Sequence, residues 1–121
     1  CISNALQNSR IPIYGKGTNV RDWIYVTDHC KGIMQALNNS QEGEIYNFGG
    51  GYELSNLKLV KMILQKLDKS EELIEFVDDR LGHDFRYAID YSKATRILDW
   101  NPKVDFEEGI EKTIEWYMNV E

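Results

Sequence analysis

The sequence lacks several features that would place it in a specialised class. Its 121 residues include two cysteines, too few for a disulfide framework and without zinc-site spacing. No run of about 18 apolar residues is present, so no segment is expected to span a membrane, and no signal peptide is recognisable. A net charge of −6 argues against a general nucleic-acid binder. We therefore expect a cytoplasmic protein with neither a membrane nor a nucleic acid as its partner.

Catalytic signatures are also missing. The sequence contains no Ser-His-Asp set, no metal-ligand spacing and no glycine fingerprint leading from a strand into a helix. The glycines at 15 and 17 indicate a plain turn more strongly than a phosphate cradle. We expect no catalytic, cofactor-binding or metal-binding residue in this chain.

The remaining composition, 42% hydrophobic and 28% charged, is that of one globular domain. Apolar runs predict strands over 11–14, 20–26, 44–48, 74–77 and 87–89. Between them, helices are expected from a cap at Thr27 or Asp28 to residues 38–40, from Ser55 to Leu67, from Ser92 to Leu98, and after Asp105. The alternation of strands and helices indicates an α/β fold.

Helical periodicity is clearest in three of these segments. The first places Cys30, Ile33, Met34 and Leu37 at i, i+3, i+4 and i+7, and we assign Cys30 and its neighbour His29 to packing or capping. The second and the last helix have one apolar face each. Those faces consist of Leu57, Val60, Ile63, Leu64 and Leu67, and of Phe106, Ile110, Ile114 and Tyr117.

A loop dense in charge lies between the strands predicted at 74–77 and 87–89. It suits an anionic ligand, because the planar fork of Arg80 or Arg86 matches a phosphate and Gly82 allows close backbone approach. It also suits a solvated turn in which the arginines pair with Asp78, Asp79 and Asp84. For a loop of this kind taken alone, the solvated turn is the commoner outcome.

Two further residues fit the same ligand. Arg21 precedes an apolar strand and is either a structural partner of Asp22 or an anion ligand. Asn56 falls in the first turn of a helix, where N–H groups and the helix dipole favour an anion. Arg21, Asn56, Arg80 and His83 are the scattered set that this interpretation would bring together on a nucleotide or phosphosugar.

Several motifs, in order, resemble the C-terminal part of the dTDP-glucose 4,6-dehydratase family of extended short-chain dehydrogenases/reductases. They are Tyr14-Gly15-Lys16-Gly17, Arg21-Asp22-Trp23-Ile24-Tyr25-Val26, Tyr46-Asn47-Phe48-Gly49-Gly50, Asp79-Arg80-Leu81-Gly82-His83-Asp84, Arg86-Tyr87-Ala88-Ile89-Asp90 and Leu98-Asp99-Trp100-Asn101-Pro102. The resemblance covers essentially all 121 residues. It implies that an N-terminal Rossmann domain, absent here, binds NAD and carries the catalytic residues, and that residues 1–121 form the nucleotide-sugar-binding portion.

Site residues are implied position by position. Pro12, Ile13 and Tyr14 resemble the segment along the nucleotide base, Arg21 a diphosphate ligand and Asn56 a polar contact. Asp79, Arg80, Leu81, Gly82 and His83 resemble a loop closing over the nucleotide, with Arg80 on phosphate. Leu81 departs from the family pattern, which has proline there, so the loop is expected to be less rigid.

The family converts dTDP-glucose to dTDP-4-keto-6-deoxyglucose with loss of water in deoxysugar (rhamnose-type) biosynthesis. The resemblance therefore implies an NAD-dependent lyase, a dTDP-sugar ligand and a homodimeric whole enzyme. We expect the 121-residue chain alone to be inactive. One alternative is another NAD-dependent nucleotide-sugar epimerase or decarboxylase that uses UDP-sugars. A stand-alone nucleotide-binding module is the other.

Overall fold

The chain, described over residues 1–120 by a computed structural model, forms two compact units. Unit 1 comprises Cys1–Arg21, Leu54–Tyr87 and the chain from Ile110 onward, and unit 2 comprises Asp22–Glu53 and Ala88–Gly109. Both units are discontinuous in sequence, because the chain passes between them at four points. Unit 1 is α/β in content, as the alternation of patterns predicts, whereas unit 2 is mostly helical in its regular structure.

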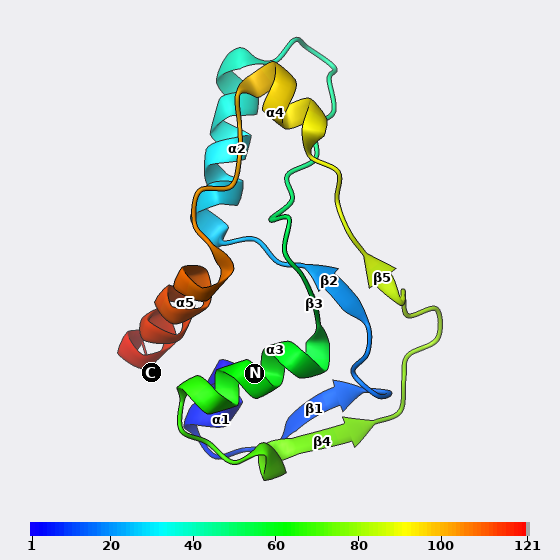
Figure 1. Cartoon of the computed structure of the whole chain (residues 1–121), viewed down its shortest axis with the longest axis vertical. Coiled ribbons are helices and arrows are strands. Elements are labelled where there is room, and N and C mark those ends of the chain that lie inside the picture. Colours follow the sequence, from blue (N-terminus) through cyan, green and yellow to red (C-terminus); the bar gives the residue numbers. More distant parts are fainter. Residues whose placement is uncertain (121) are drawn as a thin grey trace. The chain divides into compact units, whose positions relative to one another are not determined.

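Two short sheets organise unit 1. β1 (Ile11–Tyr14) pairs with β4 (Ile74–Val77), with Ile11 opposite Ile74 and Tyr14 opposite Val77. β2 (Val20–Asp22) pairs in parallel with β5 (Arg86–Tyr87), and β3 (Glu53–Ser55) completes a sheet of order β3-β2-β5. Parallel pairing brings the carboxyl ends of β1 and β4 together, so the turn 15–19 and the charged loop 78–85 leave the same edge (Figure 1).

The core of unit 1 follows the alternation along β1. Ile11 and Ile13 are buried, whereas Pro12 and Tyr14 face outward. The helices α1 (Ile2–Leu6) and α3 (Asn56–Lys66) cover the buried side of β1 (Figure 1). The buried members of this cluster are Ala5, Ile11, Ile13, Val60 and Leu64.

The predicted caps and faces of the second and last helices are confirmed. Ser55 is the N-cap of α3, and its Oγ accepts the Lys58 N–H at 3.4 Å. Asp105 caps α5 (Phe106–Val120), since its Oδ1 accepts the Glu108 N–H at 2.9 Å. Within unit 1, a second cluster joins buried Ile2, Ile63 and Ile114, with Ile110 and Tyr117 packed against it. A 3₁₀ turn, η1 (Glu71–Leu73), precedes β4.

Unit 2 is built around Trp100. Its indole packs against Phe48 and Tyr91, with ring centroids 4.9 and 5.7 Å apart, and its Nε1 donates to the Asp28 carbonyl at 3.0 Å. The helices α2 (Val26–Asn39) and α4 (Ser92–Leu98) contribute Ala36, Ala94 and Leu98 to the same cluster. None of the helices in residues 1–120 has the length and apolar character needed to cross a bilayer.

The predicted cap of α2 is wrong. The helix begins at Val26 with Tyr25 as N-cap, and Asp28 lies inside it with no exposed surface. The Asp28 carboxylate is used elsewhere, since its Oδ2 accepts the N–H groups of Lys103 and Val104 at 2.7 Å each. Asp28 therefore fastens the segment after α4 to α2.

The packed face of α2 also differs from the apolar positions in its sequence. Ile33, Met34 and Leu37 are 49%, 53% and 76% exposed, and Cys30 is exposed as well, so assigning Cys30 to packing is wrong. The buried face uses small residues instead: a Cβ on Gly32 would lie 2.6 Å from the ring of Phe48. Within unit 2, the most apolar side of α2 faces away from its core.

The strand predicted over 44–48 is wrong, and two others are shorter than predicted. Residues 44–48 pair with no strand in the part of the chain that the structure describes, and Tyr46 and Phe48 instead pack in the Trp100 cluster. The strand predicted over 20–26 ends at Asp22, and the one over 87–89 is Arg86–Tyr87. Apolar runs identify residues that can join a sheet, whereas a ladder requires a neighbouring strand.

We expect Asp28→Ala to lower the free energy of unfolding by about 2–4 kcal/mol, because two backbone N–H groups lose a charged acceptor. Urea denaturation of the chain measures the loss. The matched control is Lys31→Ala, which removes only the Lys31 Nζ–Asp28 Oδ1 contact at 3.6 Å and leaves the carboxylate in place. That control should cost at most about 0.5 kcal/mol, and equal losses in the two variants would contradict this role of Asp28.

Candidate nucleotide-binding site

The charged loop 78–85 is held together by Asp79. Its Oδ1 accepts the Arg80 N–H at 2.9 Å and lies 2.7 Å from His83 Nδ1. The other side of the carboxylate faces Gly15, where a Cβ would lie 3.0 Å from Oδ2. The hydrogen bond from His83, then that from the Arg80 N–H, holds the pKa of Asp79 below its ordinary value. The loop is therefore ordered around an ionised carboxylate.

The tip of the loop is a tight turn. The His83 N–H donates to the Arg80 carbonyl at 3.3 Å, and Gly82 has φ = +70° with open space where a Cβ would stand. A hydrogen bond from i+3 to i with a positive φ at i+2 fits a type II turn, in which proline is common at i+1. Leu81 occupies that position and is fully exposed.

Tyr14, at the end of β1, lies against this loop. Its ring meets His83 edge-on, with centroids 6.1 Å apart, and the Arg80 guanidinium lies 5.6 Å from the same ring centroid. The His83 side chain is 3% exposed, whereas Tyr14 is about half exposed. Three of the predicted site residues are thus in contact.

The two arginines of the predicted set do not pair with the acids of the loop. Arg21 on β2 donates from Nη1 to the Val20 carbonyl at 2.7 Å and from Nη2 to the Asp84 carbonyl at 3.0 Å. Within residues 1–120 neither Arg21 nor Arg80 forms an ion pair with a carboxylate, and Asp79 is paired with His83 instead. Arg80 therefore does not form the ion pair that a solvated turn would give it, and both guanidinium groups retain N–H donors that no hydrogen bond within the described chain uses.

Asn56 begins α3, but the helix N-terminus itself is already satisfied. The N–H groups of Asn56 and Leu57 donate to the carbonyls of Asn19 and Gly17 at 3.0 and 2.9 Å, and that of Lys58 to the Ser55 hydroxyl. The expectation of free N–H groups at this first turn is therefore wrong. What Asn56 can offer a ligand is its half-buried side-chain amide, which makes no hydrogen bond within the described chain.

The glycines of the turn 15–19 serve the fold. Gly15 and Gly17 have φ values of +56° and +66°, and a Cβ on Gly17 would lie 2.7 Å from Ile13 Cγ2. The Gly17 carbonyl accepts the Leu57 N–H. This confirms a plain turn. The absence of a side chain on Gly17 makes room for Ile13 and Leu57 of the protein, not for a phosphate.

Pro12 and Ile13 lie farther back along β1. The Pro12 side chain is exposed, whereas Ile13 is 4% exposed and belongs to the core. A ligand could reach Ile13 only through its backbone, on the side of β1 away from β4. Most of the predicted set gathers at the turn 15–19 and the charged loop, namely Tyr14, Arg21, Asn56 and residues 79–83. The Ile13 side chain does not.

Asn19 was missed from sequence. It is 6% exposed, and its Nδ2 donates to the Asp84 carbonyl at 3.1 Å. An asparagine after glycines reads as an ordinary turn residue, so no local signal marked it.

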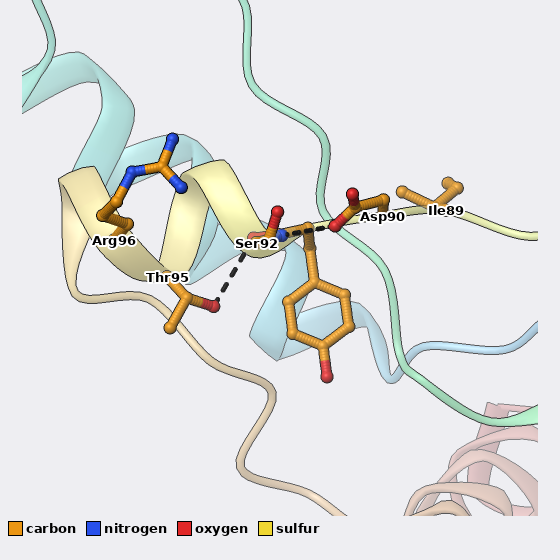
Figure 2. Close-up of a pocket in the computed structure, with 6 residues that line it drawn as sticks. Ile89, Asp90, Ser92, Thr95 and Arg96 are labelled. Atoms are coloured by element: carbon orange, nitrogen blue, oxygen red, sulfur yellow. Dashed lines mark hydrogen bonds between the residues drawn. The ribbon is translucent and has the colours of Figure 1, made fainter.

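A separate hollow of about 340 Å³ lies in unit 2, at the start of α4 (Figure 2). Asp90 accepts the Ser92 N–H there at 2.8 Å, and the Thr95 hydroxyl donates to the Tyr91 carbonyl. None of the predicted site residues lines it. Among residues 1–120, no group of three or more His, Cys, Asp or Glu is placed to hold a metal ion.

The family model described as GDP-mannose 4,6 dehydratase matches residues 1–113. The chain belongs to this family. It is 44% identical to a dTDP-glucose 4,6-dehydratase of an Actinoplanes species over 96% of its own length and 36% of the relative's. The chain thus spans about a third of the length of the curated relatives that it matches.

Solved structures of the extended short-chain dehydrogenase/reductase class share its α/β fold. The Streptomyces venezuelae dTDP-glucose 4,6-dehydratase DesIV, determined with NAD bound, superposes with a TM-score of 0.93 at 41% identity over 98% of this chain and 37% of that one. A UDP-glucose 4-epimerase from Thermotoga maritima, solved with UDP-glucose, has a TM-score of 0.90 at 28% identity over 98% and 38%. The fold is therefore shared with both the dTDP-glucose dehydratases and the UDP-sugar epimerases, whereas sequence identity is higher with the dehydratases.

We expect Leu81→Pro to raise the free energy of unfolding by about 0.4–1 kcal/mol, because proline matches this turn position and restricts the unfolded chain. The Leu81 N–H donates to no group within the described residues, so no hydrogen bond is lost. Urea denaturation measures the gain. Leu81→Ala is the control and should be neutral, since the leucine side chain is fully exposed; a destabilised proline variant would rule out the type II assignment.

Proposed function

We propose that this chain is the nucleotide-sugar-binding portion of a dTDP-glucose 4,6-dehydratase. The whole protein would convert dTDP-glucose to dTDP-4-keto-6-deoxyglucose, with loss of water, in the cytoplasm and as a homodimer. The observation that carries the proposal is a pair of arginines without carboxylate partners, Arg21 and Arg80, beside a preordered loop. Two guanidinium groups with spare donors suit a nucleoside diphosphate.

Ligand contacts are proposed for the same ten positions that the family resemblance implied. Arg21 and Arg80 would hold the diphosphate, and the side-chain amide of Asn56 would add a polar contact. Tyr14 and the exposed edge of β1 at Pro12 and Ile13 would lie along the base. The loop residues Asp79, Leu81, Gly82 and His83 would close over the nucleotide.

Sequence identity separates the two sugar-nucleotide branches. Relatives named dTDP-glucose 4,6-dehydratase are 41–45% identical over at least 95% of the chain, whereas the structures of UDP-sugar epimerases are 27–28% identical. This favours a dTDP-sugar over a UDP-sugar. A stand-alone binding module remains the second candidate, and it predicts binding without any catalytic partner.

We further propose that a preceding NAD-binding Rossmann domain completes the enzyme. NAD is bound in the solved dehydratase structures, and no dinucleotide fingerprint occurs in these 121 residues. Unit 2 supports a missing layer: the apolar side of α2 is exposed, Ile45 is 78% exposed, and residues 44–48 have no pairing strand among those described. A sheet beside these residues would pair with 44–48 and would cover the apolar side of α2.

Calorimetric titration of the 121-residue chain tests the ligand. We expect dTDP to bind more tightly than UDP, and Arg21→Ala to weaken dTDP binding by about 1.5–3 kcal/mol through loss of a charged hydrogen-bond donor. Arg10→Ala is the matched control, because Arg10 also donates to a carbonyl, that of Glu72, but at the opposite end of β1 and β4. Tighter binding of UDP would favour the epimerase branch.

Turnover tests the division of labour. The purified chain, supplied with NAD and dTDP-glucose, should form no 4-keto-6-deoxy product while still binding dTDP, because the proposed catalytic residues lie in the other domain. Product can be followed by mass spectrometry, with the intact Streptomyces venezuelae enzyme as positive control. Formation of product by the chain alone would refute this assignment.

A further inference from the structure

Asn19 is one of two polar residues buried in the described chain, the other being Asp28. It lies in the turn between β1 and β2, where side chains are normally solvated. A buried amide is stable only when its polar atoms are paired. The hydrogen-bond partners of Asn19 therefore indicate its structural role.

Those partners belong to two parts of the candidate site, and one of them is shared with Arg21. The Asn19 Nδ2 donates to the Asp84 carbonyl at 3.1 Å, and the main-chain carbonyl of Asn19 accepts the Asn56 N–H at 3.0 Å. The same Asp84 carbonyl accepts Arg21 Nη2 at 3.0 Å. Asn19 thus joins the start of α3 to the end of the charged loop, and it shares an acceptor with the arginine on β2.

We propose that Asn19 is a positioning residue for the diphosphate of the bound nucleotide, an inference that rests on the proposed function. Its side-chain amide fixes the carbonyl that orients the Arg21 guanidinium, while its main-chain carbonyl accepts the Asn56 N–H. Asn19 itself makes no contact with the ligand, since it is buried behind the loop. The chemical class that the arrangement serves is a nucleoside diphosphate.

The geometry explains why one amide has this effect. A carbonyl oxygen has two lone pairs, and at Asp84 both are used, one by Asn19 and one by Arg21. Next to it, the Val20 N–H donates to the Phe85 carbonyl at 2.7 Å. Without the Asn19 bond, the 84–85 backbone would lose its fixed orientation toward Arg21, and the adjoining hydrogen bond between Val20 and Phe85 would open more often.

The first test needs no ligand. Asn19→Leu keeps the number and branching of the side-chain heavy atoms and removes the donor. Hydrogen exchange of the Val20 amide, whose acceptor lies at the end of the charged loop, should become at least fivefold faster in this variant. The Gly15 amide, bonded to the Val77 carbonyl at the beginning of the loop, is the internal control and should be unchanged. Unchanged exchange at Val20 would overturn the positioning role.

The second test is dTDP titration of the whole chain. Asn19→Leu should weaken binding about five- to tenfold, the effect of one lost hydrogen bond that orients a charged group. Ile63→Val trims the core of the same unit without touching the site, and should leave binding unchanged. In an Arg21→Lys background the effect of Asn19→Leu should shrink to within twofold, because Asn19 acts through Arg21.

The outcomes are distinguishable. Equal loss in both arginine backgrounds, or equal loss in the Ile63→Val control, would mean a structural role only and overturn the proposal. Faster Val20 exchange with unaltered dTDP binding would overturn it as well. If the wild-type chain fails to bind dTDP, the proposed function fails, and the claim that Asn19 positions a diphosphate is overturned with it; the exchange result then shows separately whether Asn19 orders the loop.

Discussion

The parallel pairing of β1 with β4 is the constraint on which the candidate site depends. Because Tyr14 lies opposite Val77, the turn 15–19 and the charged loop 78–85 begin at the same edge. Each then leads into a strand of the second parallel pair, β2 or β5. Side chains far apart in sequence, such as Tyr14 and Arg80, meet as a result.

Order within the charged loop comes from hydrogen bonds at both of its ends and at its centre. At one end the Gly15 N–H donates to the Val77 carbonyl, and at the other the Val20 N–H donates to the Phe85 carbonyl. Between them, the Asp79 carboxylate contacts both the Arg80 N–H and the His83 ring. Such a loop does not need a rigid residue at position 81 to stay folded. The expected loosening by Leu81 is therefore opposed by contacts that do not involve its side chain.

Unit 2 shows the difference between an apolar pattern and a packed surface. The helical pattern at Ile33, Met34 and Leu37 is real, but in this chain those residues are exposed, and Gly32 and Ala36 pack inward. The run 44–48 pairs with no strand among the described residues, although Tyr46 and Phe48 pack in the Trp100 cluster. An apolar pattern shows which side chains can be buried. Whether they are buried depends on the segments that pack against them.

From the sequence alone, local chemistry determined the helices capped by Ser55 and Asp105, the Gly15–Gly17 turn, the charged loop and the family to which the chain belongs. These depend on neighbours within a few residues, or on motifs in fixed order, so they can be read directly. Only the tertiary structure decided that Arg21 and Arg80 lack carboxylate partners, that the first N–H groups of α3 are taken by the turn, and that Asn19 is buried. Each of these depends on contacts across 35 to 65 residues, such as Asn56 with Asn19 and Asn19 with Asp84, which no local pattern encodes.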